Sequence, residues 1–295
     1  MDDVVRRARE AVAGPTVDPA RFGLERLSGG MTHDVFAIED EPSLVVKVFG
    51  AFNRTEPERE WGALVSLAGS GIAPRPVHLD PGERPVVVME RVGGLSLAAD
   101  ALDAAHAAAI GGSHRLVHAT PREPPQEAPL SGLRATRAAL GQEREDSPGQ
   151  ESDPANVVDQ AWRAAQGWFA DFELDRLGSP ERLRFCRGDP NLSNYLWTDE
   201  GLVLIDWENS GHNDPALELA DMAEHASTRV LSDDFWDLVA DATELTASDR
   251  ARVWQGRRVM ACFWLVLIES RCRQGLPTTV TLEEQAKRTL AVLDP

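Results

Sequence analysis

One predicted β-hairpin constrains the fold more than any other feature of the 295-residue chain. Two short apolar runs, Tyr195–Trp197 and Leu202–Ile205, flank a polar turn that ends in glycine. This pattern is typical of a hairpin. Asn194 directly precedes the first run and Asp206 directly follows the second, so folding the hairpin brings these two side chains together.

The residues around this hairpin suit phosphoryl transfer. A carboxylate (Asp206) and an amide oxygen (Asn194) form a hard, oxygen-only donor set that suits Mg²⁺, which also takes water and phosphate oxygens as ligands. Asp189 lies on the loop that leads in, where its carboxylate can accept a proton from a hydroxyl nucleophile. An Asp-x₄-Asn spacing followed by a strand-borne Asp is the arrangement of protein-kinase-like phosphotransferases.

These motifs resemble the aminoglycoside phosphotransferase family of small-molecule kinases. Phe185–Asn194 matches the His-Gly-Asp-x₄-Asn loop of that family, Ile205–Glu208 its Ile-Asp-Trp-Glu-like run, and Asn213–Ala220 its Gly-Asp-Pro-Ala-x-Asp-Leu-Ala-like stretch. Two residues depart from the family pattern. Arg187 replaces the usual histidine and, as a hydrogen-bond donor to loop carbonyls, can still support the catalytic loop. Glu218 replaces the usual aspartate before Leu-Ala.

The resemblance also implies a phosphate-binding lysine and its partner. Lys47 lies in an apolar strand pattern and matches the lysine that reaches the α- and β-phosphates. The chain has only one other lysine, Lys287, so a lysine retained here indicates that a compact point charge is needed. Glu60 matches the helix glutamate that pairs with this lysine, although the nearby Glu56 and Glu58 are alternatives.

Two backbone segments complete the implied nucleotide site. Ser28, Gly29 and Gly30 resemble the turn that covers the nucleotide between two strands. The carbonyl of Glu90 and the amide of Val92 match the interlobe linker that holds the nucleotide base. This second assignment depends on the resemblance alone.

The implied fold class is α+β, with the two lobes of a protein-kinase-like fold. Residues 1–91 form the N-lobe, a nucleotide-binding antiparallel sheet with one helix at Glu56–Ala68. Residues 92–295 form a mostly helical C-lobe that holds the catalytic hairpin, the metal site and the acceptor pocket. Residues 120–155 are rich in Pro, Glu, Gln, Ser and Gly, which predicts a mobile insertion with one short helix at Leu133–Leu140.

Local patterns place the other elements. The Ala-rich segment Ser96–His118 predicts a helix that is broken at Gly111-Gly112, and Ala155–Leu177 predicts a second helix. Strands are expected at Leu24–Leu27, Val35–Glu39, Leu44–Phe49 and Pro85–Met89.

Composition excludes some classes of function. The formal net charge is −18, with −5 in residues 1–100 and −13 in the remainder. An acidic surface repels phosphate backbones and anionic lipids, so neither a nucleic acid nor a membrane is an expected partner. The longest apolar stretch, Ala261–Ile268, is far shorter than the ~20 residues of a spanning helix. The charged N-terminus lacks the apolar core of a signal peptide, so a cytoplasmic location is expected.

The implied activity is transfer of a phosphoryl group from ATP or GTP, with Mg²⁺, to a hydroxyl group of a small molecule. An aminoglycoside or another antibiotic is the leading acceptor, because the acidic surplus would complement a cation; a neutral acceptor is also compatible. Candidate acceptor-binding acids are Glu208, Asp214 and Glu269. The alternatives are a small-metabolite kinase (choline, sugar, amino-sugar adduct or homoserine type) and a regulatory nucleotide-binding pseudokinase.

Overall fold

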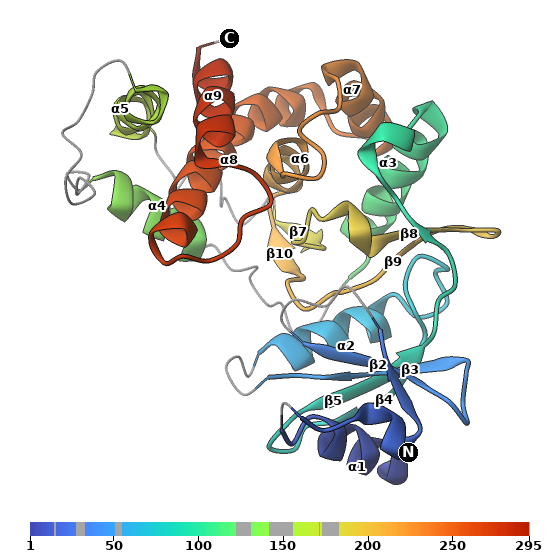
Figure 1. Cartoon of the computed structure of the whole chain (residues 1–295). Helices are drawn as coiled ribbons and strands as arrows, with labels where there is room; N and C mark the ends of the chain where they lie inside the picture. Colours follow the sequence, from blue (N-terminus) through green and yellow to red (C-terminus); the bar gives the residue numbers. More distant parts are fainter. Residues whose placement is uncertain are drawn as a thin grey trace.

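The computed structural model describes residues 1–14, 16–27, 33–50, 55–121, 131–141, 156–170, 172 and 183–294, with the backbone alone for 131–134. The described chain forms a sheet-containing N-terminal part and a mostly helical C-terminal part, which lie one above the other in Figure 1. The predicted boundary at residues 91 and 92 falls between the last strand of the large sheet and the first strand of the C-terminal part.

A five-stranded antiparallel sheet forms the N-terminal part. Its strand order is β1(Leu24–Arg26), β2(Asp34–Ile38), β3(Leu44–Val48), β5(Val86–Glu90) and β4(Pro76–Asp80). Four of these strands match the predicted ones to within two residues at each end. Strand β4 was not predicted, because two prolines stand at and before its start. A proline is tolerated at the first residue of an edge strand, and β4 is such a strand.

The two faces of the sheet carry different helices. Helix α1 (Asp2–Ala11) packs on the face that includes Val46 and Val48, and α2 (Glu56–Ser66) packs on the opposite face. Because side chains alternate along a strand, Lys47 points to the α2 face, which is also the face toward the C-terminal part. The sequence analysis predicted α2 but not α1, whose charged residues obscured its buried positions at Val4, Val5, Ala8 and Ala11.

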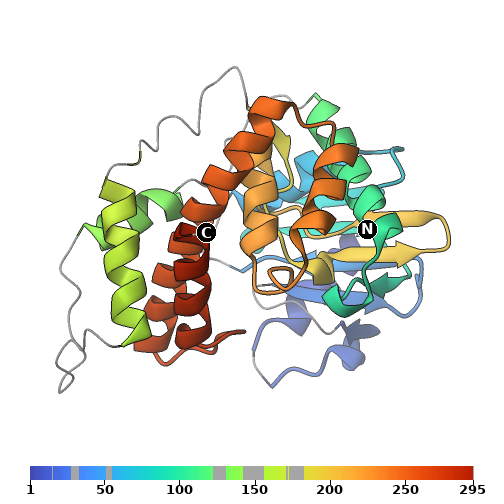
Figure 2. The same ribbon diagram turned by 90° about the horizontal axis from the view of Figure 1, so that it is seen from above.

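The C-terminal part surrounds two small sheets with helices. The hairpin strands β8(Tyr195–Thr198) and β9(Gly201–Leu204) pair as predicted, with β6(Leu95–Ser96) beside β8. Strand β7(Arg184–Cys186) pairs with β10(Gly211–Asn213). The helices are α3(Ala104–Ala119), α4(Ser131–Leu140), α5(Val157–Ala170), α6(Pro215–Glu224), α7(Asp233–Ala242), α8(Ala247–Arg273) and α9(Leu282–Leu293). Seen from above in Figure 2, α4, α5 and α9 gather on the side away from the hairpin.

Helix α3 corrects one prediction, since it continues through Gly111 and Gly112 without a break. A Cβ atom at Gly111 would lie 2.4 Å from the carbonyl oxygen of Val239 and 2.6 Å from the Cβ of Ala242. Gly111 therefore allows α3 to pack closely against α7, and it does not end the helix.

The predicted insertion lies largely outside the described residues. Within it the structure describes α4, which contains the expected helix Leu133–Leu140. Helix α5 covers the first part of the helix expected over 155–177. Within the described ranges, no helix is both long enough and apolar enough to cross a membrane.

Candidate active site

Lys47 is the centre of a buried ion cluster between the two parts of the chain. Its Nζ lies 3.0 Å from Glu60 Oε2 on α2, 2.5 Å from Asp206 Oδ1 after β9, and 2.7 Å from Glu208 Oε2. Glu60 Oε2 also accepts a hydrogen bond of 2.9 Å from the Trp207 amide. Glu60 is thus the helix glutamate that pairs with Lys47, and it connects α2 to the segment that follows the hairpin.

The surrounding carboxylates keep Lys47 protonated although it is buried. Although burial opposes it, the carboxylates of Glu60, Asp206 and Glu208 raise the pKa of Lys47 above its ordinary value. Burial likewise acts to raise the pKa of Glu208, but hydrogen bonds from His33 and Lys47 lower that pKa to about 2. Burial raises the pKa values of Glu60 and Asp206. Three converging carboxylates therefore depend on one cation.

We expect Lys47→Met to destabilise the protein by about 3–5 kcal/mol, because it leaves buried carboxylates without a counter-charge. The uncompensated carboxylates then have native pKa values above their unfolded ones, so the variant loses stability as the pH rises. Urea unfolding should thus show a larger deficit against wild type at pH 8 than at pH 5. Lys287→Met is the matched control, because Lys287 forms an exposed i,i+4 pair with Glu283 and should change little. A deficit that is equal for both variants would contradict this account.

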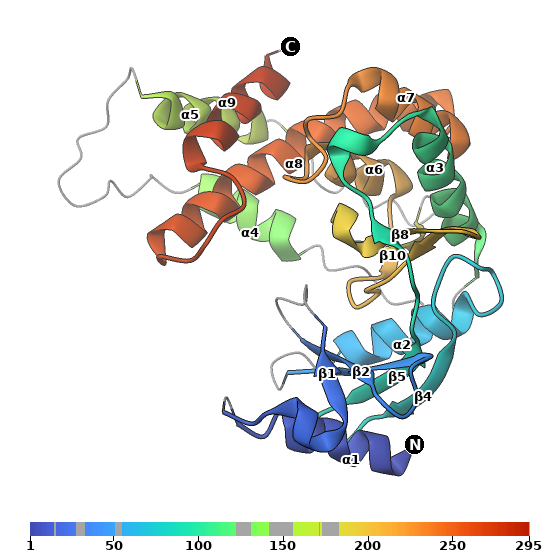
Figure 3. The same ribbon diagram turned by 45° about the vertical axis from the view of Figure 1, so that its right-hand side comes forward.

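The hairpin register places the predicted metal-binding residues together. Tyr195 pairs with Leu204 across the hairpin. The Ile205 amide then donates a hydrogen bond of 3.0 Å to the carbonyl of Asn194. Asn194 and Asp206 therefore stand at the open end of the same hairpin, which faces α2 in Figure 3.

The loop before the hairpin holds Asp189 firmly. Asp189 Oδ2 accepts a hydrogen bond of 2.7 Å from Asn194 Nδ2, and Oδ1 accepts one of 2.9 Å from the Asn191 amide. Gly188 adopts a left-handed φ of 75°, and a Cβ at this position would lie 2.3 Å from the carbonyl oxygen of Asn209. Only glycine fits there, so Gly188 sets the direction in which Asp189 leaves β7.

Arg187 was expected to donate to carbonyls of the loop, but its described hydrogen bonds go to the segment after β9. Its fully buried guanidinium donates to the carbonyl oxygens of Ile205, at 2.7 Å, and Asp206, at 3.4 Å. The same group lies over the rings of Tyr195 and Trp207, with 4.9 Å and 5.9 Å to the centroids. Arg187 thus binds the backbone of Asp206, the predicted metal ligand.

The donor atoms fit a magnesium ion. Asn194 uses its Nδ2 for Asp189, and its Oδ1 accepts no hydrogen bond from any residue that the structure describes. Asp206 Oδ2 is likewise unengaged within the described ranges, while Oδ1 faces Lys47. Two oxygen donors of this type, beside a phosphate-binding cation, suit Mg²⁺ better than a softer metal.

Backbone strain marks the same position. Asp206 has a φ of 65°, and among the described residues only Glu244 is another non-glycine with a left-handed φ. Such conformations are uncommon outside glycine and concentrate at functional sites. The contacts of Asp206 with Lys47 and of its carbonyl with Arg187 hold it there.

Glu218 anchors the start of the catalytic loop, a role that the sequence analysis did not assign. Its Oε1 accepts hydrogen bonds from the amides of Arg187, at 2.5 Å, and Gly188, at 3.1 Å. Its Oε2 faces His114 Nδ1 at 3.0 Å and His118 Nε2 at 2.6 Å. The spacing of the two histidines, four residues apart on α3, was the available signal. Their partner on α6 emerges only from the packed fold.

A second group of side chains lies near Asp189. Asp221 on α6 is half-buried, and burial together with the charges of Asp189 and Glu218 raises the pKa of Asp221 to about 7. Trp264 Nε1 on α8 donates to Asp221 Oδ1 at 3.3 Å, and the Trp264 ring contacts His225 edge-on at 5.0 Å. Burial lowers the pKa of His225 to about 4. The sequence analysis did not identify this group, because its members come from two helices that meet only in the packed fold.

The other predicted residues occupy varied places. Glu208 contacts Lys47 and His33. Asp214 is buried, caps α6 through the Ala216 amide and pairs with Arg252. Glu269 is buried on α8 and pairs with Arg273. Their roles in acceptor binding stay predictions. Glu90 ends β5 and Val92 lies in the linker to β6, while Ser28, Gly29 and Gly30 fall outside the described residues.

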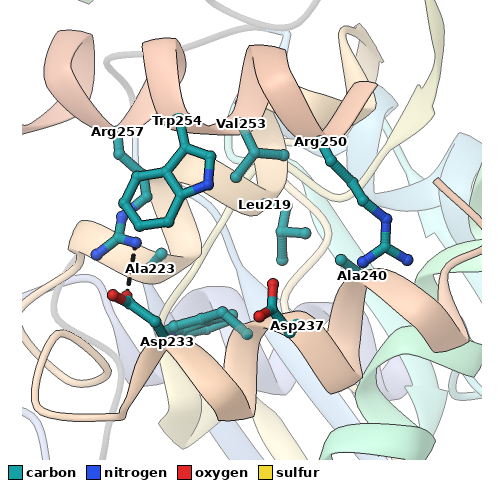
Figure 4. A pocket seen from close by; sticks show the side chains of 10 residues that line it. Leu219, Ala223, Asp233, Asp237, Ala240, Arg250, Val253, Trp254 and Arg257 are labelled. Atoms are coloured by element: carbon teal, nitrogen blue, oxygen red, sulfur yellow. Dashed lines mark hydrogen bonds and ion pairs between the residues drawn. The ribbon is translucent and has the colours of Figure 1, made fainter. Parts of the chain in front are cut away.

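A cavity between α6, α7 and α8 is too small for a substrate. Figure 4 shows it lined by residues such as Leu219, Val253 and Trp254, with Arg257 paired to Asp233 at one end. Its volume is about 30 Å³. A cavity of this size holds about one or two water molecules. None of its lining residues belongs to the Lys47 cluster or to the catalytic loop.

Comparisons with known proteins agree with this geometry. The sequence model of the phosphotransferase enzyme family matches residues 23–260. No curated protein matches the chain in sequence.

Solved structures share the fold over nearly the whole chain. A choline/ethanolamine kinase family protein from Mesorhizobium loti has a TM-score of 0.69 at 21% identity, covering 100% of this chain and 96% of that one. Choline kinase LicA from Streptococcus pneumoniae has a TM-score of 0.62 at 17% identity, covering 99% and 98%. The streptomycin–ATP–APH(2")-IIa ternary complex has a TM-score of 0.60 at 12% identity, covering 99% and 95%.

Proposed function

Because this chain belongs to the phosphotransferase enzyme family, we propose that it transfers the γ-phosphoryl group of ATP or GTP to a hydroxyl group of a small, amine-bearing molecule. The observation that carries the proposal is the contact of Lys47 with Asp206, because it joins the cation of the sheet to the acidic end of the hairpin. Asp189 and Asn194 stand at that same end, bound to each other.

In the proposed reaction the acceptor oxygen attacks the γ-phosphorus, and the bond from that phosphorus to the bridging oxygen of the nucleoside diphosphate breaks. Asp189 orients the hydroxyl and accepts its proton. Its own position is fixed by Asn191 and Asn194. Lys47, held by Glu60, places the α- and β-phosphates. Most of the rate enhancement comes from positioning and electrostatics, because the transition state is loose.

Asn194 and Asp206 are the residues that would hold Mg²⁺. When bound, the ion neutralises charge on the phosphate oxygens.

Asp221 and Trp264 support an amine-bearing acceptor. A carboxylate and an indole that already contact each other, close to the catalytic carboxylate, suit an ammonium group through an ion pair and a cation–π contact. Of the three structural neighbours named above, one is a choline kinase and one is a complex with streptomycin. Choline and streptomycin are both alcohols that carry a cationic nitrogen group. An aminoglycoside and a choline-type alcohol share the chemistry that this site would recognise.

The pH dependence of acceptor binding tests this assignment. Asp221 is neutral below its pKa of about 7 and charged above it, so a cation should bind more tightly as the pH rises from 6 to 8. One proton released per cation corresponds to at most about a tenfold change in affinity per pH unit. His225, with a pKa of about 4, stays neutral over this range. Asp221→Asn should weaken binding and flatten the profile in calorimetry. The exposed Asp234→Asn on α7 should do neither, and an unchanged Asp221→Asn profile would place the cation elsewhere.

The experiment that tests the function is nucleotide consumption with ATP and GTP, with and without Mg²⁺. The acceptor panel contains aminoglycosides, choline and ethanolamine, with macrolides, neutral sugars and homoserine as comparisons. Stimulation by one amine-bearing class supports the proposal and identifies the acceptor. Stimulation by a neutral acceptor alone would refute the amine assignment. Nucleotide binding that needs no Mg²⁺ and leads to no transfer would indicate a pseudokinase.

A further inference from the structure

A buried polar network joins the two ends of the catalytic loop to the helices beneath it. The loop runs from Arg187 to Tyr195 and carries Asp189 and Asn194 between these ends. At its start, the Arg187 and Gly188 amides bind Glu218 Oε1. At its end, the Tyr195 hydroxyl lies 2.9 Å from His114 Nε2. The other ring nitrogen of His114, Nδ1, lies 3.0 Å from Glu218 Oε2, so one imidazole spans both ends.

Burial separates the side chains of this network from solvent. Tyr195 is fully buried, and His114 and Glu218 are 4% and 5% exposed. The Tyr195 hydroxyl lies 2.9 Å from His114 Nε2 and 3.6 Å from the thioether sulfur of Met222, and it also interacts with the Arg187 guanidinium. With its proton on Nδ1, the His114 ring accepts from the Tyr195 hydroxyl at Nε2. His114 then donates to Glu218, which keeps Oε1 for the two loop amides.

We propose that His114 is a positioning residue that holds both ends of the catalytic loop, through Glu218 at the start and Tyr195 at the finish. This inference rests on the proposed function, because the loop matters through Asp189 and Asn194. It goes beyond the sequence motifs, because Tyr195 was assigned only to an apolar strand and His114 lies on α3, away from those motifs. His118 strengthens the Glu218 end through its bond to the same oxygen but does not reach Tyr195.

Two substitutions remove the same link from its opposite sides. Tyr195→Phe deletes the hydroxyl, with its contacts to His114 and Arg187, and keeps the ring over Arg187. His114→Asn keeps an amide donor in place of Nδ1 and loses Nε2. Thr289→Val on α9 is the matched control, because it also deletes a fully buried hydroxyl, which bonds only within the α8–α9 region.

We expect each single variant to lower kcat about tenfold with little change in the KM for nucleotide, because a misplaced base and metal ligand raise the barrier without touching Lys47. The double variant should lose about the same tenfold, since both changes break one link. Thr289→Val should lower the melting temperature about as much as Tyr195→Phe does, and it should leave kcat unchanged. Unchanged kcat in Tyr195→Phe, an equal loss in Thr289→Val, or multiplying effects in the double variant would each overturn the proposal.

Hydrogen exchange provides a readout that needs no substrate. The Arg187 and Gly188 amides should exchange at least about threefold faster in Tyr195→Phe and His114→Asn than in Thr289→Val, because loosening the network opens the loop locally. Equal exchange in all three variants would refute the network. If wild type transfers phosphate to no acceptor but the exchange rates differ as expected, the proposed function fails and the structural link stands.

Discussion

We expect Asp189→Ala to lower kcat by about 10²- to 10⁴-fold, the range typical of losing a positioned proton acceptor. We expect a loss of this size because hydrogen bonds from Asn191 and Asn194 hold the Asp189 carboxylate in one orientation. The KM for nucleotide should change little, because Lys47 and Glu60 belong to the sheet and to α2. Steady-state kinetics with the acceptor identified from the panel measures both quantities.

The matched control for this variant is Asp199→Ala. Asp199 is an exposed carboxylate in the turn of the same hairpin, so it tests whether loss of any nearby negative charge lowers the rate. Its kcat should equal that of wild type. A fall in Asp189→Ala of less than about tenfold would show that the proton leaves without this base, since even modest general-base catalysis exceeds that factor.

Local sequence patterns predicted the parts of the site that depend on neighbouring residues. The register of β8 and β9 follows from the turn length and the apolar runs, and it places Asn194 next to Ile205. Alternation along β3 directs Lys47 to one face, and the helical period of α2 brings Glu60 to meet it. In both cases a single element and its period determine where the side chain points.

The remaining parts depend on how separate elements pack, which no local pattern encodes. The bond of His114 to Glu218 needs α3 and α6 to lie side by side, and the contact of Asp221 with Trp264 needs α6 beside α8. Gly111 is another residue whose role depends on helix packing and not on its local sequence. Its sequence signal indicated a break, whereas its physical role is to let α7 approach.

The Arg187 substitution illustrates how packing accommodates a changed motif residue. A guanidinium is longer than an imidazole, and here it reaches past the loop to the carbonyls of Ile205 and Asp206. The rings of Tyr195 and Trp207 cover it, which compensates part of the cost of burying a charge. Arg187 therefore holds the segment after β9, while Glu218 holds the start of the loop.

Asp206→Asn is expected to reduce Mg²⁺-dependent turnover by about 10³-fold or more, because it removes the charged oxygen donor beside the transferring phosphate. Asparagine is a better replacement than alanine for this test. Asp206 has a left-handed φ of 65°, which asparagine tolerates well and alanine does not. The backbone should therefore keep its position, and Lys47 should retain its contacts with Glu60 and Glu208.

Glu244→Gln is the control for this substitution. Glu244 shares the left-handed backbone, with a φ of 61°, and its carboxylate pairs with Arg115 far from Lys47. Nucleotide affinity measured with and without Mg²⁺ separates the two roles of Asp206. Wild type and Glu244→Gln should bind nucleotide more tightly with the ion, whereas Asp206→Asn should bind equally with and without it. Near-full turnover in Asp206→Asn would show that the metal assignment is wrong.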